Sequence, residues 1–164
     1  MGHFVISVPT QNEVSAQEFA YDGYKIQTVR NVSQSEFQAK VAARENELRT
    51  KRRVGSSNGN AQTKSSGLQL AESPDQNSRI LAFSGVEVPN VELSFDVEGY
   101  ARAGSNMYIL RTQADSDYLP KLMPKDGSLF RDVRYRDDQT VPTEKGFCFD
   151  GGYITGDTSA CSPA

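Results

Sequence analysis

Residues 91–98 alternate strictly between apolar and polar side chains, and this pattern constrains the fold more than any other feature of the chain. A β-strand with one buried and one wet face has this period of two. The apolar set is Val91, Leu93, Phe95 and Val97, and the polar set is Glu92, Ser94, Asp96 and Glu98. Gly104-Ser105-Asn106 then predicts a tight turn into a second strand at residues 107–111. We therefore expect an antiparallel meander that packs its apolar face on a helix and exposes its acidic face to solvent.

The clearest helix begins after Ser33, where the sequence Ser33-Gln34-Ser35-Glu36 matches a capping box. In this motif the serine hydroxyl and the glutamate carboxylate each accept a hydrogen bond from the other residue's backbone amide. Good helix formers continue over residues 37–53, with one apolar stripe. The stripe consists of Phe37, Val41 and Leu48. Arg44 lies in the same stripe, so its guanidinium must either extend to solvent or meet a carboxylate, and we favour the first arrangement.

Other segments complete the predicted fold. Residues 4–8, 19–30 and 79–83 have strand patterns, and Asp22-Gly23 predicts a hairpin turn within the second of them. Pro120, Pro124 and Gly127 are expected to interrupt the chain before a short second helix at residues 128–136, and residues 146–154 predict a strand around a turn. The chain therefore belongs to the α+β class, with an antiparallel sheet packed against one long amphipathic helix and a short second helix.

Residues 49–71 are basic and have no packing pattern. Five positive charges and no acidic residue fall in this window, and we expect a mobile basic loop over residues 54–67. The charges are Arg49, Lys51, Arg52, Arg53 and Lys64. Such a loop can dock on an acidic partner or an anionic membrane surface, and it is equally consistent with a solvated helix end.

Composition and charge exclude several classes of protein. The chain has 164 residues, of which 37% are hydrophobic and 24% charged, so it can bury a modest core. No apolar run approaches the roughly 20 residues that a membrane-spanning helix needs. With a net charge of −3, the chain does not have the excess of basic residues that general nucleic-acid binding requires.

The residues that usually carry catalysis are scarce. The single His3 and the two cysteines match no zinc pattern and leave no serine or cysteine triad, so we expect no catalytic residue, no metal and no cofactor. Cys148, between Phe147 and Phe149, is expected to be buried or disulfide-bonded. The opening residues have no export signal, which fits either a cytoplasmic protein or a trimmed targeting segment.

Three segments together resemble one family. They are Gly2-His3-Phe4 leading to a strand pattern and Pro9, the helix residues 35–49, and residues 142–148 with the sequence Pro-Thr-Glu-Lys-Gly-Phe-Cys. This combination resembles the immunity proteins of type VI secretion lipase effectors, in the group paired with the fourth class of those phospholipases. The resemblance implies a periplasmic protein of two domains that grips its cognate lipase across the substrate entrance and blocks it.

The resemblance also implies a division of the chain. Residues 1–140 correspond to an N-terminal immunity-type domain, and residues 141–164 to a linker signature and the truncated start of a second domain. The missing export signal is then expected to have been trimmed.

We consider three functions. The first is an immunity module that binds a phospholipase effector, with aromatic and arginine anchors at Arg52, Arg53, Tyr118 and Tyr135. The second is a non-catalytic, envelope-associated structural or binding lipoprotein domain. An enzyme is the third, and the sequence offers no residues for it.

Cys148 and Cys161 form a possible disulfide. They are 13 positions apart around turn-forming glycines, and an oxidising periplasm would keep the bridge. A loop of this size is worth on the order of 3 kcal/mol in the chain-entropy model. The alternative is a bond from Cys148 to a cysteine upstream of Met1.

Overall fold

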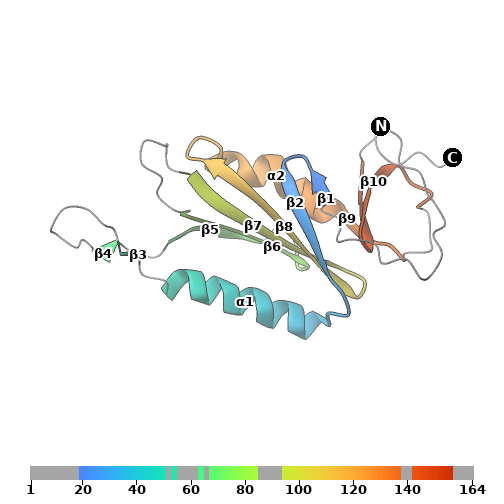
Figure 1. Cartoon of the computed structure of the whole chain (residues 1–164), viewed down its shortest axis with the longest axis horizontal. Helices are drawn as coiled ribbons and strands as arrows, with labels where there is room; N and C mark the ends of the chain where they lie inside the picture. Colours follow the sequence, from blue (N-terminus) through green and yellow to red (C-terminus); the bar gives the residue numbers. More distant parts are fainter. Residues whose placement is uncertain are drawn as a thin grey trace, which may run out of the picture.

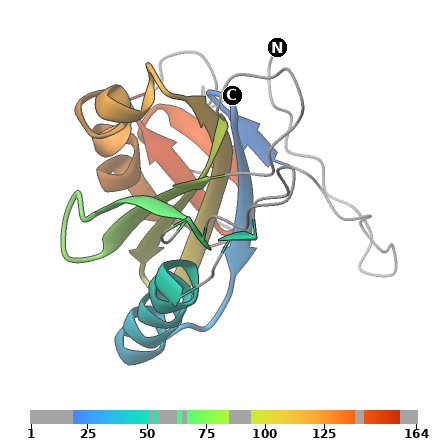
Figure 2. The ribbon, with the colours of Figure 1, turned by 90° about the vertical axis from the view of Figure 1, so that its left-hand side faces the viewer.

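The computed structural model describes residues 19–50, 53–54, 63–64, 67–84, 94–137 and 142–156. These residues form an α+β fold around a six-stranded antiparallel sheet, as the sequence predicts (Figure 1). Across the sheet the strands follow the order β1 (Phe19–Tyr21), β2 (Tyr24–Val29), β8 (Asn106–Asp115), β7 (Ser94–Ala103), β6 (Ser78–Ser84) and β5 (Leu68–Glu72). The helices α1 (Gln34–Thr50) and α2 (Leu122–Asp132) lie on opposite sides of this sheet (Figures 1 and 2).

Two tight turns fix the register of the sheet. The turn between β1 and β2 consists of Asp22 and Gly23, both with positive φ (46° and 81°), so the predicted hairpin is confirmed. The turn between β7 and β8 contains Gly104 with φ of 58°, and the two strands pair continuously from Ala103–Asn106 to Ser94–Asp115. This long hairpin forms the centre of the sheet.

The capping box predicted at the start of α1 is present. The Ser33 amide donates to Glu36 Oε2 at 2.9 Å, and the Glu36 amide donates to Ser33 Oγ at 3.3 Å. Val32, just before the cap, is buried with Phe37 in one cluster, which is the arrangement called a hydrophobic staple. The predicted stripe of Phe37, Val41 and Leu48 is buried against β6, β7 and β8, where it meets Leu81, Tyr100, Met107 and Ile109.

The expectation that the acidic face of β7 is exposed is wrong. Glu98 is only 8% exposed, because α1 covers the face of the sheet on which it lies. Arg44 donates from Nε and Nη2 to the two carboxylate oxygens of Glu98, each at 2.9 Å, and the Tyr100 hydroxyl donates to the same carboxylate at 2.6 Å. Arg44 therefore meets a carboxylate instead of extending to solvent. Burial alone would raise the pKa of Glu98, but the hydrogen bonds from Arg44 and Tyr100 outweigh it and hold that pKa below its usual value.

The opposite face of the sheet is covered by α2 and by a small second sheet. The second sheet has the strand order β10 (Gly146–Phe149), β11 (Gly152–Thr155) and β9 (Val133–Tyr135), and its β10–β11 hairpin confirms the strand and turn predicted at residues 146–154. Its inner side chains join those of the main sheet and α2 in the larger core cluster. That cluster includes Ile26, Ile80, Val97, Leu110, Leu122, Phe130, Val133, Phe149 and Ile154.

The second helix lies earlier in the chain than predicted. It spans Leu122–Asp132 after a short 3₁₀ helix, η1 (Leu119–Lys121), and residues 133–135 form β9 instead of continuing the helix. Pro124 does not interrupt α2, because proline is tolerated in the first turn, where no intrahelical amide bond is lost. The helix ends at Asp132 because the next residue, Val133, has an extended backbone (φ −67°, ψ 128°) and starts β9. Phe130, in its last turn, packs directly on Gly99 of β7, where an added Cβ would lie 1.8 Å from the ring.

Several predicted segments fall outside the described residues. They are the strand at residues 4–8, residues 91–93 of the alternating segment and most of the loop at residues 54–67. Within the basic window, β3 (Arg53–Val54) pairs with β4 (Thr63–Lys64) in a short antiparallel ladder. None of the helices in the described ranges is long and apolar enough to cross a bilayer.

Replacing Arg44 by alanine tests the buried ion pair. We expect Arg44→Ala to lower the free energy of unfolding by about 3 kcal/mol at neutral pH, because it leaves the Glu98 carboxylate buried without its main partner. Since the pKa of Glu98 is lowered in the folded protein, the pair stabilises above the ordinary carboxyl pKa of about 4.3 and this contribution is lost as the pH falls through the folded value. Urea unfolding at several pH values measures both effects.

The matched control for this prediction is Arg49→Ala. Arg49 forms an exposed i,i+4 pair with Glu45 at 2.6 Å on the same helix, and exposed pairs contribute at most about 1 kcal/mol. Equal losses in the two variants would contradict a special role for Arg44.

Candidate interaction surface

Tyr135 is the large apolar side chain that stands out on the surface of the described residues. It is 42% exposed, although it lies at the end of a strand that pairs with β11. Its ring rests on Gly104 of the β7–β8 turn, where an added Cβ would lie 2.6 Å from Tyr135 Cγ. The absence of a side chain at Gly104 thus leaves room for the ring, and a fixed, exposed aromatic ring is a common anchor in protein interfaces.

Charged residues lie near Tyr135 in the sequence and across the small sheet. Tyr135 pairs in register with Gly152, and the turn just before Gly152 carries Asp150, which forms an exposed ion pair with Arg30 at 2.5 Å. Arg134, the residue before Tyr135, donates to the carbonyl oxygens of Arg131 and Val133 at the C-terminal end of α2. An aromatic residue within a rim of charged groups is the usual composition of an interface centre and its edge.

Arg136 adds a positive charge next to Tyr135. Its amide donates to the carbonyl of Gly151 at 3.1 Å, which fixes the backbone. Its Nε is buried and has no hydrogen-bond partner among the described residues. Neither Arg134 nor Arg136 forms a salt bridge in the described part of the chain.

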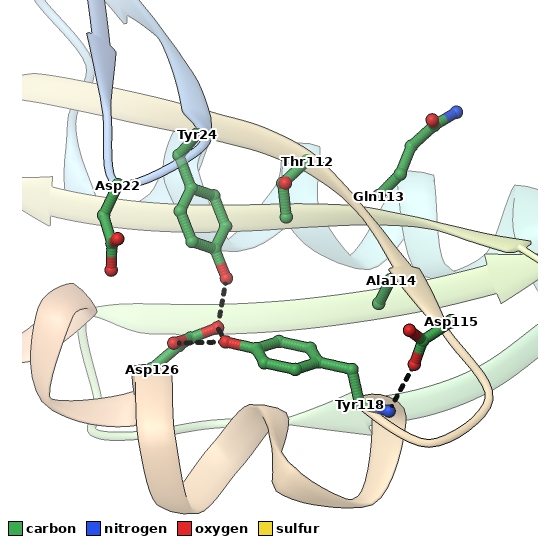
Figure 3. Close-up of a pocket in the computed structure, with 8 residues that line it drawn as sticks. All are labelled: Asp22, Tyr24, Thr112, Gln113, Ala114, Asp115, Tyr118 and Asp126. Carbon is green, nitrogen blue, oxygen red and sulfur yellow. Dashed lines mark hydrogen bonds between the residues drawn. The ribbon is translucent and has the colours of Figure 1, made fainter.

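Tyr118 lies in a different environment, at the rim of an acidic depression of about 280 Å³ (Figure 3). Its hydroxyl donates to both oxygens of Asp126, each at 2.9 Å, and the Tyr24 hydroxyl donates to Asp126 Oδ2 at 2.7 Å. The backbone amide of Tyr118 donates to Asp115 Oδ1 at 2.6 Å. The remaining lining residues are Asp22, Thr112, Gln113 and Ala114.

The buried carboxylate of Asp126 in this depression holds neighbouring elements of the fold together. Asp126 is only 4% exposed, and its two tyrosine bonds tie α2 to β2 and to the segment before η1. Burial and the Asp126 carboxylate raise the pKa of Tyr24 and raise that of Tyr118 to about 12. In the described residues, no three His, Cys, Asp or Glu side chains are grouped as metal ligands.

The described part of the chain places two of the four predicted contact residues, Tyr118 and Tyr135, in different regions of the fold. Arg52 lies outside the described residues, and Arg53 is placed in β3 with only its backbone described. Tyr135 contacts the turn just before the first residue of β8, whereas Tyr118 lies just after the last residue of β8. At 3.3 Å per residue, the two ends of this ten-residue strand are roughly 30 Å apart. A single small contact patch therefore cannot include both tyrosines.

Cys148 lies on β10, where it pairs in register with Tyr153 and is half-buried. Cys161 lies outside the described residues, so the disulfide between them stays a prediction.

Sequence reasoning missed two residues that organise these surfaces. Asp126 lies between Pro124 and Gly127, where the sequence predicts only a break, and its partner Tyr24 lies 102 positions away, so no local pattern connects them. At Gly104 the sequence predicts only a hairpin turn, and nothing in it signals that Tyr135 rests there.

Comparison with known proteins identifies relatives. The family model described as the Tle cognate immunity protein 4 N-terminal domain matches residues 1–139. No curated protein sequence matches the chain.

Among solved structures, an apo immunity protein TplEi of the type VI secretion system (T6SS) of Pseudomonas aeruginosa is similar over 83% of this chain, with a TM-score of 0.66 and 23% identity. A chain in a crystal structure of a Tle4–Tli4 complex gives the same values. A TplEi structure with an "L" peptide gives a TM-score of 0.54 and 20% identity over 82% of this chain. The similarity covers 43%, 42% and 39% of these solved chains, so this chain spans less than half of their length.

The tyrosine environments predict a steep loss of stability at high pH. Burial, with hydrogen bonds to carboxylates at three of the four phenols, raises the pKa of Tyr24, Tyr100, Tyr108 and Tyr118 above the ordinary value of about 10. Because these pKa values are higher in the folded state than in the unfolded chain, the neutral phenols stabilise the fold fully below pH 10. This contribution to the free energy of unfolding is lost as the pH rises through the pKa values of the folded state, which are about 12 for Tyr108 and Tyr118. We expect these phenols to ionise only as the chain unfolds.

Tyrosinate absorbance and far-ultraviolet circular dichroism, followed together against pH, measure this coupling. Tyr118→Phe should remove one ionisation from the late phase. If all seven tyrosines ionised together near pH 10 while the circular dichroism stayed constant, the prediction would be wrong.

Proposed function

Because the chain belongs to the family of Tle cognate immunity protein 4, whose N-terminal domain model matches residues 1–139, we propose that it binds a cognate type VI secretion phospholipase effector. The family match carries this proposal. The shared fold with a chain of the Tle4–Tli4 complex supports it, since that structure holds a protein of this architecture in a complex.

The mode of action that we propose is occlusion of the effector's substrate entrance. Stoichiometric inhibition of this kind needs a complementary surface of about 800 Å² per partner and no chemistry by the inhibitor. We therefore propose a non-catalytic role in the periplasm, where an immunity protein can meet a lipase before it reaches its phospholipid substrate.

Within the described surface, Tyr135 is the anchor that we favour. The ring is already held by Gly104, so little side-chain entropy is lost when it becomes buried in an interface. The positive charges of Arg134 and Arg136, which flank Tyr135 in the sequence, favour an acidic surface on the effector. Tyr118 is a weaker choice, because its hydroxyl is already bound to Asp126. Arg52 and Arg53 of the basic segment remain proposed contacts.

Calorimetry with the co-encoded lipase tests the proposed function. We expect full-length protein containing this domain to bind the lipase and to abolish its phospholipase activity at equal molar amounts. The absence of detectable binding would reject the immunity function and leave the envelope-associated binding domain as the alternative. Binding without loss of activity on phospholipid vesicles would reject only the occlusion of the substrate entrance.

Replacement of Tyr135 tests the anchor. We expect Tyr135→Ala to raise the dissociation constant for the lipase by about 30-fold, the roughly 2 kcal/mol that marks a residue at the centre of an interface. Tyr135→Phe keeps the ring on Gly104 and should lose much less.

Gln38→Ala, at an exposed position on α1, is the matched control and should bind like the parent protein. Thermal unfolding of each variant separates lost affinity from lost structure. Unchanged affinity in Tyr135→Ala would place the interface elsewhere on the domain.

A further inference from the structure

The β10–β11 hairpin follows the matched family domain in the sequence, yet its side chains complete the core of that domain. Phe149 and Ile154 are each 2% exposed and belong to the cluster formed by the main sheet and α2. The Phe149 ring meets the Tyr108 ring of β8 edge to face, with 5.1 Å between centroids. Without the hairpin, this side of the core would be open to water.

The carbonyl oxygen of Gly151, at the tip of the hairpin, is bonded from two other segments. It accepts from Tyr108 Oη at 2.5 Å, from Asn106 Nδ2 at 3.2 Å and from the Arg136 amide at 3.1 Å. Tyr108 and Asn106 are both buried, so their donors depend on this one carbonyl.

The backbone of the hairpin approaches β8 too closely for a side chain. A Cβ added at Gly152 would lie 2.7 Å from Phe149 and 2.9 Å from the Tyr108 ring. Gly151 has φ of 63°, and a Cβ there would lie 2.7 Å from Asn106 Nδ2. The backbone of the hairpin and the side chains of β8 therefore pack together without space for a further methyl group, as in the interior of a single domain.

Two polar contacts tie the same turn to β2. Thr28 Oγ1 donates to the carbonyl of Asp150 at 2.7 Å, and Arg30 forms its ion pair with the Asp150 side chain. The hairpin thus contacts β2, β8 and β9, which are separated from it by up to 122 positions in the chain.

From these contacts we infer that residues 142–156 unfold together with the described part of residues 19–137 as one cooperative unit, in which the β10–β11 hairpin closes the core. The inference does not depend on the proposed function. The family resemblance implies a different division, with a linker signature and the truncated start of a second domain over residues 141–164, and the two arrangements give different results in the experiments that follow.

Native-state hydrogen exchange on the unaltered chain is the first test. We expect the amides of β11, the central strand of the small sheet, to exchange within about tenfold of the slowest amides of β8, as members of one cooperative unit do. Exchange of β11 a hundredfold or more faster than β8 would show that the hairpin opens by itself and would overturn the inference.

Gly152→Ala is the second test, with Gly67→Ala as its matched control. Nothing lies within 4 Å of a Cβ added at Gly67, so that variant should melt like the parent chain. In Gly152→Ala the clash with Tyr108 should lower the melting temperature of the whole chain by roughly 5 °C or more, in one transition seen equally by near- and far-ultraviolet circular dichroism. Two separate transitions, with the main one at the parent temperature, would overturn the inference.

Discussion

The long β7–β8 hairpin is the constraint on which the rest of the structure depends. Its ten register pairs commit every side chain of two central strands to one face or the other. Both faces are covered, one by α1 and the other by α2 and the small sheet, so each polar side chain in the middle of these strands needs a partner inside the protein (Figure 2). Glu98 is such a side chain, and its partner is Arg44 of α1, which donates two hydrogen bonds to the Glu98 carboxylate.

This dependence explains the position of α1. An arginine in the apolar stripe of a helix ordinarily extends its guanidinium to solvent. Here the two-bond contact with Glu98 and the Phe83 ring, 5.3 Å from Arg44 Cζ, make burial of the stem favourable. The apolar stripe and the ion pair therefore specify the same rotation of the helix about its axis, which gives a more definite register than apolar contacts alone.

The features that the sequence predicts correctly are local ones. The capping box, the Asp22-Gly23 turn, the presence of a strand at β7 and the turn at Gly104 each depend on residues only a few positions apart, so their patterns are visible in the chain itself. The errors concern contacts between distant residues. Glu98 is 54 positions from Arg44, and Asp126 is 102 positions from Tyr24, so the sequence showed an acidic face and a chain break where the folded protein has buried carboxylates. The start of α2 differs from the prediction for a local reason, because the rule that proline ends helices does not apply in the first turn, where Pro124 lies.

The proposed interface and the closing hairpin meet at the same residues. Tyr135 owes its position to Gly104 beneath the ring and to Gly152, its register partner in β11. Arg136 is held through the carbonyl of Gly151, and Arg30 through Asp150. Movement of the hairpin away from Tyr108 would therefore displace the aromatic ring and both arginines together. A recognition surface built in this way is rigid only while the core behind it is closed, so we expect packing at Phe149 and Ile154 to influence the affinity of the proposed interface even though both side chains are buried.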